Sequence, residues 1–413
     1  MISKTSIENL KNQIDIVDIV SSYIELKKSG TSFKACCPFH GEETPSFTVS
    51  PAKQIYHCFG CSNGGDAIKF VMEYEKLTYP EAIEKIAALT NFNLEYDNND
   101  SQALNTSILD AVNNYYQNNL LSNQNALQYL NSRGITKESI DKFQIGYASS
   151  SNDTITYLKN NFFDLNMAKE LGVIDSGSNG LYARFIERIT FPIFLQSGKL
   201  VGFGGRTISG HNAKYVNSPA TKLFNKSALL FGYNLARESI YQSKEIIITE
   251  GYLDVVMLHQ AGFANSVATL GTALTSQHIP LLKKSDAKVI LGYDGDKAGM
   301  EAAYKASILL AQNDFVGGVV IFQNGQDPAD YVKEGRVDEL KSLLLHPKYF
   351  VEFALDYIVK DNLGNYRFDI NRPEEKQKIV VKIEEFLSTL KPVMAEEFKG
   401  YAAHLINLHP KYI

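Results

Sequence analysis

Two short cysteine and histidine pairs near the beginning of the chain constrain its fold more than any other feature. Cys37 and His40 stand three positions apart, and Cys58 and Cys61 repeat that spacing after an intervening stretch of 17 residues. Each pair fits one tight turn, and two such turns facing each other across short strands offer four ligands in the arrangement that structural Zn²⁺ prefers. Because protein ligands fill every coordination position, the predicted zinc stabilises a small domain and performs no hydrolysis.

One cysteine is left over by this assignment. Cys36 could replace its neighbour as a ligand, but Cys37 has the better spacing to His40. The alternative, in which the four residues share no metal, requires the paired spacing to arise by accident. All four cysteines fall within 26 positions, which argues against a disulfide framework and favours a reducing, cytoplasmic compartment. No run approaches the roughly 18 apolar residues of a membrane span, so we expect neither a membrane partner nor a signal peptide.

The length of 413 residues predicts several domains rather than one core. The segment 97–106 consists mostly of Asn, Asp, Ser and Gln, and we expect it to be a flexible linker. The predicted organisation is a zinc domain over 1–96, the linker over 97–106, a mixed α+β basic subdomain over 107–242, a parallel-sheet α/β subdomain over 243–336 and a helical subdomain over 337–413.

The α/β subdomain carries acids at positions that predict a metal site. Short apolar strands alternate there with helices, which indicates a parallel sheet covered on both faces. Glu250, Asp294, Asp296 and Asp327 each follow one of these strands, at the sheet edge where ligands collect in such folds. Clustered carboxylates repel one another unless cations lie between them, and oxygen ligands suit Mg²⁺ or Mn²⁺. We therefore expect two or more divalent ions at this edge.

Helix capping is the alternative explanation for these acids. Glu250 and Asp296 each precede a predicted helix, whose N-terminus favours a carboxylate. Capping does not require acids after three successive strands, so we favour the metal site. Asp254 lies one helical turn after Glu250 and would be either a ligand or a residue that orients one.

The charge of the chain is distributed unevenly along the sequence. The net charge is −5, yet residues 180–240 hold eight bases and two acids, whereas residues 245–340 hold thirteen acids and seven bases. A basic segment beside an acidic one suits a protein that binds nucleic acid. The alternative is two solvated faces of unrelated domains.

With these motifs placed, the chain resembles the bacterial replicative primases of the DnaG type over nearly all of its length. The resemblance rests on three groups of motifs that occur in the family's order. The similar segments are ACCPFH (35–40), TPSF (44–47) and YHCFGC (56–61) for the CHC2 zinc ribbon, GFGGR (202–206), KYVNSP (214–219) and FNK (224–226) for the basic polymerase segment, and EGYLD (250–254), LGTAL (270–274) and YDGDKAG (293–299) for the Toprim module shared with topoisomerases.

The resemblance implies a DNA-directed RNA polymerase that makes short RNA primers on single-stranded DNA during chromosomal replication. It implies that Glu250, Asp294 and Asp296 are the catalytic metal-binding acids, with Asp327 as an additional magnesium ligand. The implied contacts to template and incoming nucleotide are Arg133, Arg206, Lys214, Asn217 and Lys226. Where the family often has a second Asp after Asp327, this chain has Ala329, followed by Asp330.

The resemblance also implies partners. These are a single-stranded DNA template, ribonucleoside triphosphates, an RNA–DNA hybrid product and a replicative helicase, with the chain acting as a cytoplasmic monomer at the nucleoid. The family's C-terminal helicase-binding domain has no counterpart here, which indicates either a truncated chain or a helicase contact elsewhere.

A platform for single strands is expected in the zinc domain, formed by Lys34, Phe47, Lys53, Tyr56, His57 and Phe59.

Several alternatives stay open from the sequence. Phe203 and Tyr215 would either stack on template bases or serve as core aromatics. Glu250 would be a metal ligand or a base, and the zinc domain would act within one chain or between two. A different Toprim enzyme, such as a topoisomerase or nuclease, and a zinc-ribbon scaffold without catalysis are competing functions. A helicase–primase fusion is disfavoured because no G-x-x-x-x-G-K-[ST] motif occurs.

Overall fold

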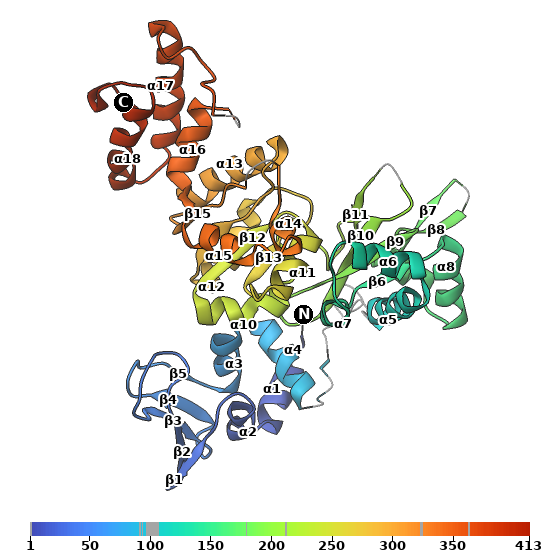
Figure 1. The fold of residues 1–413 in the computed structure, drawn as a ribbon. Helices are drawn as coiled ribbons and strands as arrows, with labels where there is room; N and C mark the ends of the chain where they lie inside the picture. Colours follow the sequence, from blue (N-terminus) through green and yellow to red (C-terminus); the bar gives the residue numbers. More distant parts are fainter. Residues whose placement is uncertain are drawn as a thin grey trace. The chain divides into compact units, whose positions relative to one another are not determined.

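The computed structural model divides the chain into two compact units, Met1–Asn105 and Thr106–Ile413. Figure 1 follows the chain from the blue N-terminal unit to the red C-terminal helices. The structure describes residues 2–90, 92, 94–95, 107–178, 180–210, 213–322, 325–361 and 364–413. The predicted linker at 97–106 lies outside these residues, and the predicted boundaries at 242 and 336 stay predictions.

The first unit is an antiparallel sheet packed against helices. Its five strands lie in the order β1-β2-β3-β4-β5. Its elements are α1 (Lys4–Gln13), α2 (Ile16–Ser21), β1 (Lys27–Ser29), β2 (Ser32–Ala35), β3 (Phe47–Ser50), β4 (Ile55–Cys58), β5 (Gly64–Gly65), α3 (Ala67–Glu75) and α4 (Tyr79–Leu89). Asp66 begins α3 by accepting a hydrogen bond from the Lys69 amide, a typical N-cap.

Strand alternation decides which aromatic residues of this unit are buried. Side chains of a strand point alternately to opposite faces, and in β4 Tyr56 and Cys58 are buried while Ile55 and His57 are exposed. Tyr56 stacks on Phe47 with ring centroids 5.2 Å apart. Since Phe47 is 0% and Tyr56 1% exposed, the expectation that they belong to a platform for single strands was wrong: both are core residues.

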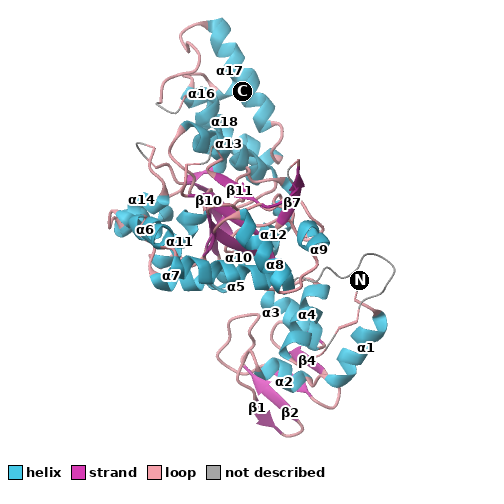
Figure 2. Cartoon of the chain, turned by 90° about the vertical axis from the view of Figure 1, so that its right-hand side faces the viewer, coloured by secondary structure: helices cyan, strands magenta, loops and turns pink. Residues whose placement is uncertain are grey.

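The second unit begins with an antiparallel sheet in the order β11-β10-β9-β6 and a separate β7-β8 hairpin. The elements are α5 (Ser107–Ser122), α6 (Gln124–Ser132), α7 (Lys137–Lys142), β6 (Gly146–Ala148), α8 (Ser151–Asn160), α9 (Leu165–Glu170), β7 (Ile174–Gly177), β8 (Gly180–Ala183), β9 (Arg188–Phe194), β10 (Leu200–Thr207) and β11 (Tyr215–Asn217). Phe203 on β10 is fully buried, 5.8 Å from the ring of Tyr116, so it is a core aromatic residue. Figure 2 shows these strands with helices beside them.

A mixed sheet in the order β13-β12-β14-β15-β16 follows. Its first four strands are parallel, and β16 pairs antiparallel with β15. The elements are α10 (Tyr233–Ser243), β12 (Glu245–Thr249), α11 (Tyr252–Gln260), β13 (Ser266–Ala268), η1 (Ser276–His278), α12 (Ile279–Ser285), β14 (Lys288–Leu291), α13 (Lys297–Gln312), β15 (Gly317–Val319), α14 (Pro328–Lys333), α15 (Val337–Leu345) and β16 (Lys348–Tyr349).

Helices cover both faces of this sheet, as its apolar strands predict. Ile246 and Ile248 of β12 pack with residues of α10, α12 and α13. Ile247, between them, points the other way and packs with residues of α11, α14 and α15. Period-two alternation therefore divides one strand between two cores. The parallel strands end at one edge, and the acids of the predicted metal site follow them there.

The chain ends in a helical group comprising α16 (Phe350–Val359), α17 (Pro373–Leu387), α18 (Pro392–Leu405) and η2 (Pro410–Tyr412). Phe350 and Phe353 of α16 pack into the sheet core, whereas Val351 and Leu355 pack with α17 and α18. The predicted fold class, a zinc ribbon followed by α+β, α/β and helical parts, is confirmed. Within the described ranges no helix combines the length and apolar character needed to span a bilayer.

Candidate functional site

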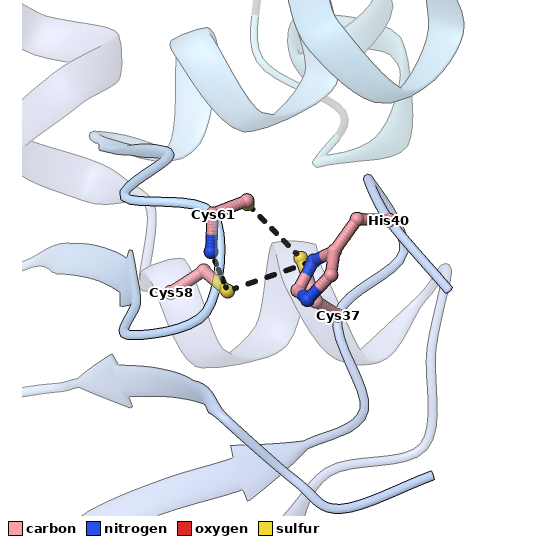
Figure 3. Close-up of side chains that lie close together, drawn as sticks. All are labelled: Cys37, His40, Cys58 and Cys61. Atoms are coloured by element: carbon pink, nitrogen blue, oxygen red, sulfur yellow. Dashed lines mark hydrogen bonds between the residues drawn. The ribbon is translucent and has the colours of Figure 1, made fainter. Parts of the chain in front are cut away.

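The four predicted zinc ligands lie together in the first unit. Figure 3 shows Cys37, His40, Cys58 and Cys61 converging from two loops, and their ligand atoms all lie within 4.8 Å of one another. The Sγ atoms of Cys37 and Cys61 are 3.9 Å apart. Ligands at about 2.3 Å from a tetrahedral zinc have sulfur atoms about 3.8 Å apart, so the donor set fits Zn²⁺. Cys36 is exposed and is not part of the cluster.

Backbone amides donate hydrogen bonds to two of the sulfur atoms of this cluster. The amides of Gly60 and Cys61 donate to Cys58 Sγ at 3.3 and 3.4 Å, and the amide of Phe39 donates to Cys37 Sγ at 3.4 Å. Hydrogen bonds of this kind favour the thiolate, which is the form that binds a metal. The two loops are therefore shaped for a metal-bound state.

Glu42 holds the first of these loops in place, although the sequence analysis did not identify it. Its carboxylate accepts the amides of Cys37 at 2.7 Å and Ser46 at 3.0 Å, and Ser46 is the main cause that lowers the Glu42 pKa. The second carboxylate oxygen lies 3.2 Å from His40 Nε2, while Nδ1 faces Cys58 Sγ at 3.9 Å. Such a contact orients a metal-binding imidazole. The available signal was an acid two positions after His40.

The outer face of the zinc-unit sheet carries polar and aromatic side chains. The strand register aligns Lys27, Lys34, Thr48 and His57 in one row across four strands. Phe59 is 75% exposed, and its ring centroid lies 4.8 Å from that of His57. Of the predicted platform, Lys34, His57 and Phe59 are thus exposed near this face, while exposed Lys53 lies in the turn after β3.

A cleft of about 290 Å³ lies at the carboxyl edge of the parallel sheet. Both acidic and basic side chains line it. The acids are Glu250, Asp254, Asp294, Asp327 and Asp330. The bases are Arg133, Arg206, Lys214 and Lys333. The strand ends and the preceding basic subdomain therefore meet in one cavity.

Burial and mutual repulsion perturb the acids of the cleft. Burial, together with the charges of Asp294 and Asp296, raises the pKa of Glu250 to about 7. Burial and the charge of Asp327 raise the pKa of Asp294 to about 6. Glu250 Oε1 is buried and has no hydrogen-bond partner among the described residues. An unpartnered buried carboxylate oxygen beside like charges fits a site for a divalent cation.

Two further acids extend this group. Asp254 is 7% exposed, and burial together with the charge of Asp327 raises its pKa well above the ordinary range. Its Oδ2 accepts the Gly251 amide at 3.0 Å, so it also ties down the turn that carries Glu250. Asp327 and Asp330 exchange backbone-to-carboxylate hydrogen bonds at the start of α14. Asp330 thus lies beside Asp327 in the cleft, one position beyond Ala329.

Asp296 is the predicted catalytic acid that the structure places differently. It is exposed and does not line the cleft. Its Oδ1 accepts the Gly299 amide at 2.8 Å, and it is the N-cap of α13. The capping alternative therefore describes its observed contact, and a metal-binding role for Asp296 stays a prediction.

The predicted nucleotide-binding residues divide into two groups. Arg133, Arg206 and Lys214 line the cleft, and the charge of Lys214 opposes the rise in the Asp294 pKa. Lys226 is exposed and is not among the lining residues. Asn217 accepts a hydrogen bond from the Tyr252 hydroxyl and donates to the Leu270 carbonyl at 2.7 Å. Both ends of its amide therefore connect β11 to the α/β subdomain.

Two residues near the cleft were missed by the sequence analysis. Lys333 lines the cleft at the end of α14. The guanidinium groups of Arg133 and Arg206 lie over the Tyr129 ring, and their Cζ atoms are 5.6 and 5.2 Å from the ring centroid, respectively. Its spacing of four residues from Arg133 on one helix was the only local signal, because Arg206 lies far away in the sequence.

Three family models match successive parts of the chain. They are the CHC2 zinc finger at residues 2–102, the N-terminal domain of the DNA primase catalytic core at 115–237 and the Toprim-like model at 247–332. The match to Toprim agrees with a divalent-metal site at the strand ends, and the CHC2 match agrees with zinc in the first unit.

Curated relatives and solved structures agree with these matches. A DNA primase of Helicobacter pylori (strain ATCC 700392 / 26695) is 46% identical over 412 residues, which cover 98% of this chain and 72% of the relative. The crystal structure of the zinc-binding and RNA polymerase domains of the Aquifex aeolicus primase is 34% identical, with a TM-score of 0.65 and 98% of both chains covered. A DnaG primase catalytic domain bound to single-stranded DNA is 26% identical, with a TM-score of 0.65, covering 74% of this chain and 97% of that one. The chain therefore belongs to the bacterial DNA primase family of the DnaG type.

Proposed function

We propose that the chain joins ribonucleoside triphosphates into short RNA primers on single-stranded DNA, a nucleotidyl transfer of the DNA-directed RNA polymerase class that leaves an RNA–DNA hybrid. The observation that supports this reaction best is the cleft in which buried strand-end acids and the bases of the preceding subdomain meet. Acids suit metal ions and bases suit phosphates, and a nucleoside triphosphate with its metal needs both.

Glu250, Asp294 and Asp327 would hold two or more Mg²⁺ or Mn²⁺ ions, with Asp254 and Asp330 supporting them. When bound, these ions would neutralise the triphosphate and stabilise charge on the entering and leaving oxygen atoms. Asp254 orients Glu250 through the Gly251 amide. Glu250 would act either as a metal ligand or as a base toward the reacting hydroxyl.

The bases of the cleft would bind and align the phosphates. Arg206 and Arg133 present guanidinium groups, whose planar fork pairs with phosphate in a directional way, while Lys214 supplies a point charge near Asp294. Alignment of the 3′-hydroxyl with the reacting phosphate contributes a large part of such catalysis. Asn217 would support this alignment by fixing β11 against the α/β subdomain, and Lys226 would contact template outside the cleft.

We infer that the zinc unit contacts template through its outer sheet face. Lys34 offers a charge for backbone phosphates, and exposed Phe59 with the neighbouring His57 offers rings on which unpaired bases can stack. A related DnaG catalytic domain has been solved with single-stranded DNA, which supports this class of ligand. The cytoplasmic replication fork, a replicative helicase partner and a monomeric state are part of the same proposal.

The competing functions are less well supported. A topoisomerase or nuclease would share the Toprim centre, but the CHC2 and primase-core models match beside it. A scaffold without catalysis would not need a buried, unpartnered carboxylate among like charges.

Primer synthesis tests the proposal directly. The chain is incubated with all four ribonucleotides, single-stranded DNA and Mg²⁺, and compared with Asp294→Asn and with Asp338→Asn, an exposed acid on α15. Native protein and Asp338→Asn should make labelled oligoribonucleotides, while Asp294→Asn should make almost none. Absence of product from the native chain, or equal product from Asp294→Asn, would refute the proposed reaction.

A further inference from the structure

Three residues that line the cleft, Arg133, Arg206 and Tyr215, form a contact group with Tyr129. Tyr129 and Arg133 lie four residues apart on α6 and its C-terminal cap, so they share one face of the helix. Arg206 and Tyr215 are directly opposite each other on β10 and β11 and point to the same face of the sheet. The helix and the sheet thus bring two arginines and two tyrosines together.

The guanidinium group of Arg206 lies near both tyrosine rings. Its Cζ is 5.2 Å from the centroid of Tyr129 and 5.1 Å from that of Tyr215, and its Nη1 donates to the Tyr215 hydroxyl at 2.5 Å. These are cation–π distances, at which a ring face attracts a guanidinium group. Both tyrosines therefore contact the guanidinium group of Arg206.

Arg206 is buried without an acidic partner. It is 7% exposed, and its Nε has no hydrogen-bond partner among the described residues. No ion pair joins Arg206 to a carboxylate in the part of the chain that the structure describes, although the cleft contains five acids. A buried cation held by rings keeps its charge and its remaining donors for an anion.

Tyr129 serves both arginines with one ring. Arg133 Cζ lies 5.6 Å and Arg206 Cζ 5.2 Å from the centroid of this ring, so the position of one ring affects both guanidinium groups. The Tyr129 hydroxyl is buried and has no hydrogen-bond partner among the described residues. The ring, and not the hydroxyl, is thus the part of Tyr129 that the arrangement uses.

We propose that Tyr129 is a positioning residue that holds Arg133 and Arg206 at a fixed spacing, so that the two guanidinium groups bind one polyphosphate chain. This inference rests on the proposed function, because it identifies the triphosphate of the nucleotide as the ligand of these two arginines. Two guanidinium forks in one cleft can pair with different phosphates of one chain, whereas the lysines of the cleft supply point charges. Backbone phosphates of the template share this chemistry, and the experiment separates the two sources.

Binding is measured with a fluorescent ATP analogue and Mg²⁺, with inorganic tripolyphosphate as competitor, and separately with a short oligothymidylate. Tyr129→Leu should weaken tripolyphosphate binding about five- to tenfold, and Tyr129→Phe should restore it to within about twofold. Oligothymidylate affinity should change by less than about twofold. Tyr115→Leu is the matched control, because Tyr115 stacks on Tyr157 at 4.1 Å and does not line the cleft.

The two arginines provide a second arm that leaves Tyr129 in place. Arg133→Lys and Arg206→Lys should each weaken tripolyphosphate binding. The binding free energy lost by the double variant should be smaller than the sum of the two single losses, because both arginines bind the same ligand. Additive losses, an unchanged affinity in Tyr129→Leu, failure of Tyr129→Phe to restore binding, or a loss confined to oligothymidylate would overturn the proposal. Primer synthesis by the native chain is scored separately: its absence would refute the proposed function, while tripolyphosphate binding would still decide the role of Tyr129.

Discussion

Gly299 lies at a position where the carboxyl edge of the parallel sheet leaves no room for a side chain. It is the third residue of α13, buried against the loop that precedes the helix. A Cβ added to Gly299 would lie 2.2 Å from the Asp294 carbonyl oxygen and 2.9 Å from Glu250 Oε1. Favourable contacts between heavy atoms begin at about 3.5 Å, so the substitution Gly299→Ala forces a shift of about 1 Å between the helix and these acids.

The magnitude follows from two opposing effects. Alanine favours a helix over glycine by about 1 kcal/mol, while overpacking of a buried site costs about 1–3 kcal/mol. Gly400, an exposed residue of α18, isolates the first effect, because a methyl group added there would meet nothing within 4 Å. Gly400→Ala should therefore be slightly more stable than the native chain, and Gly299→Ala about 1–3 kcal/mol less stable than Gly400→Ala.

Urea unfolding followed by far-ultraviolet circular dichroism measures this difference, and primer synthesis measures its consequence. A displacement of about 1 Å at reacting groups can lower a rate about 100-fold, so Gly299→Ala should nearly abolish synthesis while Gly400→Ala retains it. Equal stability of the two variants, together with native synthesis by Gly299→Ala, would show that α13 does not need this close approach.

Three further predictions concern other parts of the chain. Glu42→Ala should weaken zinc binding about 10- to 100-fold in a chelator competition, because it removes the contacts of Glu42 to His40 and to the loop amides. Glu43→Ala, which changes the adjacent exposed acid, should leave zinc binding unchanged. Equal losses in the two variants would contradict this role of Glu42. Burial lowers the pKa of His259 to about 4 from its ordinary 6.5, so the unfolded chain takes up the proton first and stability should be lost as pH falls through that window, by up to about 3 kcal/mol. Urea unfolding at pH 7 and pH 5 should show a smaller loss for His259→Gln, and an identical loss would refute the assignment. Lys214→Ala should lower the salt dependence of single-stranded DNA binding by about one unit of slope, whereas an unchanged slope would exclude a phosphate contact.

The sequence predicted the location of the cleft because strand order and strand ends follow from local patterns. Apolar strands alternating with helices predict a parallel sheet, and acids after parallel strands meet at one edge. The structure places Glu250, Asp294 and Asp327 there. Asp296 accepts the Gly299 amide through Oδ1, so its spacing alone does not distinguish helix capping from metal binding, and its metal-binding role stays a prediction.

The two wrong predictions in the zinc unit, which placed Phe47 and Tyr56 on an exposed platform, have a different cause. Tyr56 and Cys58 are two positions apart on β4, and alternate residues of a strand share a face. Because Cys58 is buried with the metal cluster, Tyr56 must point to the same face, and so must Phe47, which is the strand partner of Cys58. Alternation could have predicted this outcome, whereas the placement of Tyr129 under Arg206 depends on tertiary packing that no local pattern encodes.

The acids and bases that line the cleft do not neutralise one another by forming ion pairs. Five acids and four bases line it, yet no ion pair within 4.0 Å joins a member of one set to a member of the other among the described residues. Internal pairing would add little net stability, because desolvation of the charges offsets their attraction, and it would occupy the groups that bind a ligand. Burial raises the pKa values of Glu250 and Asp294 in the acidic set, and Arg206 in the basic set is held by rings instead of a carboxylate. A ligand that carries cations on one side and phosphates on the other complements both sets at once, and a metal-bound nucleoside triphosphate has that composition.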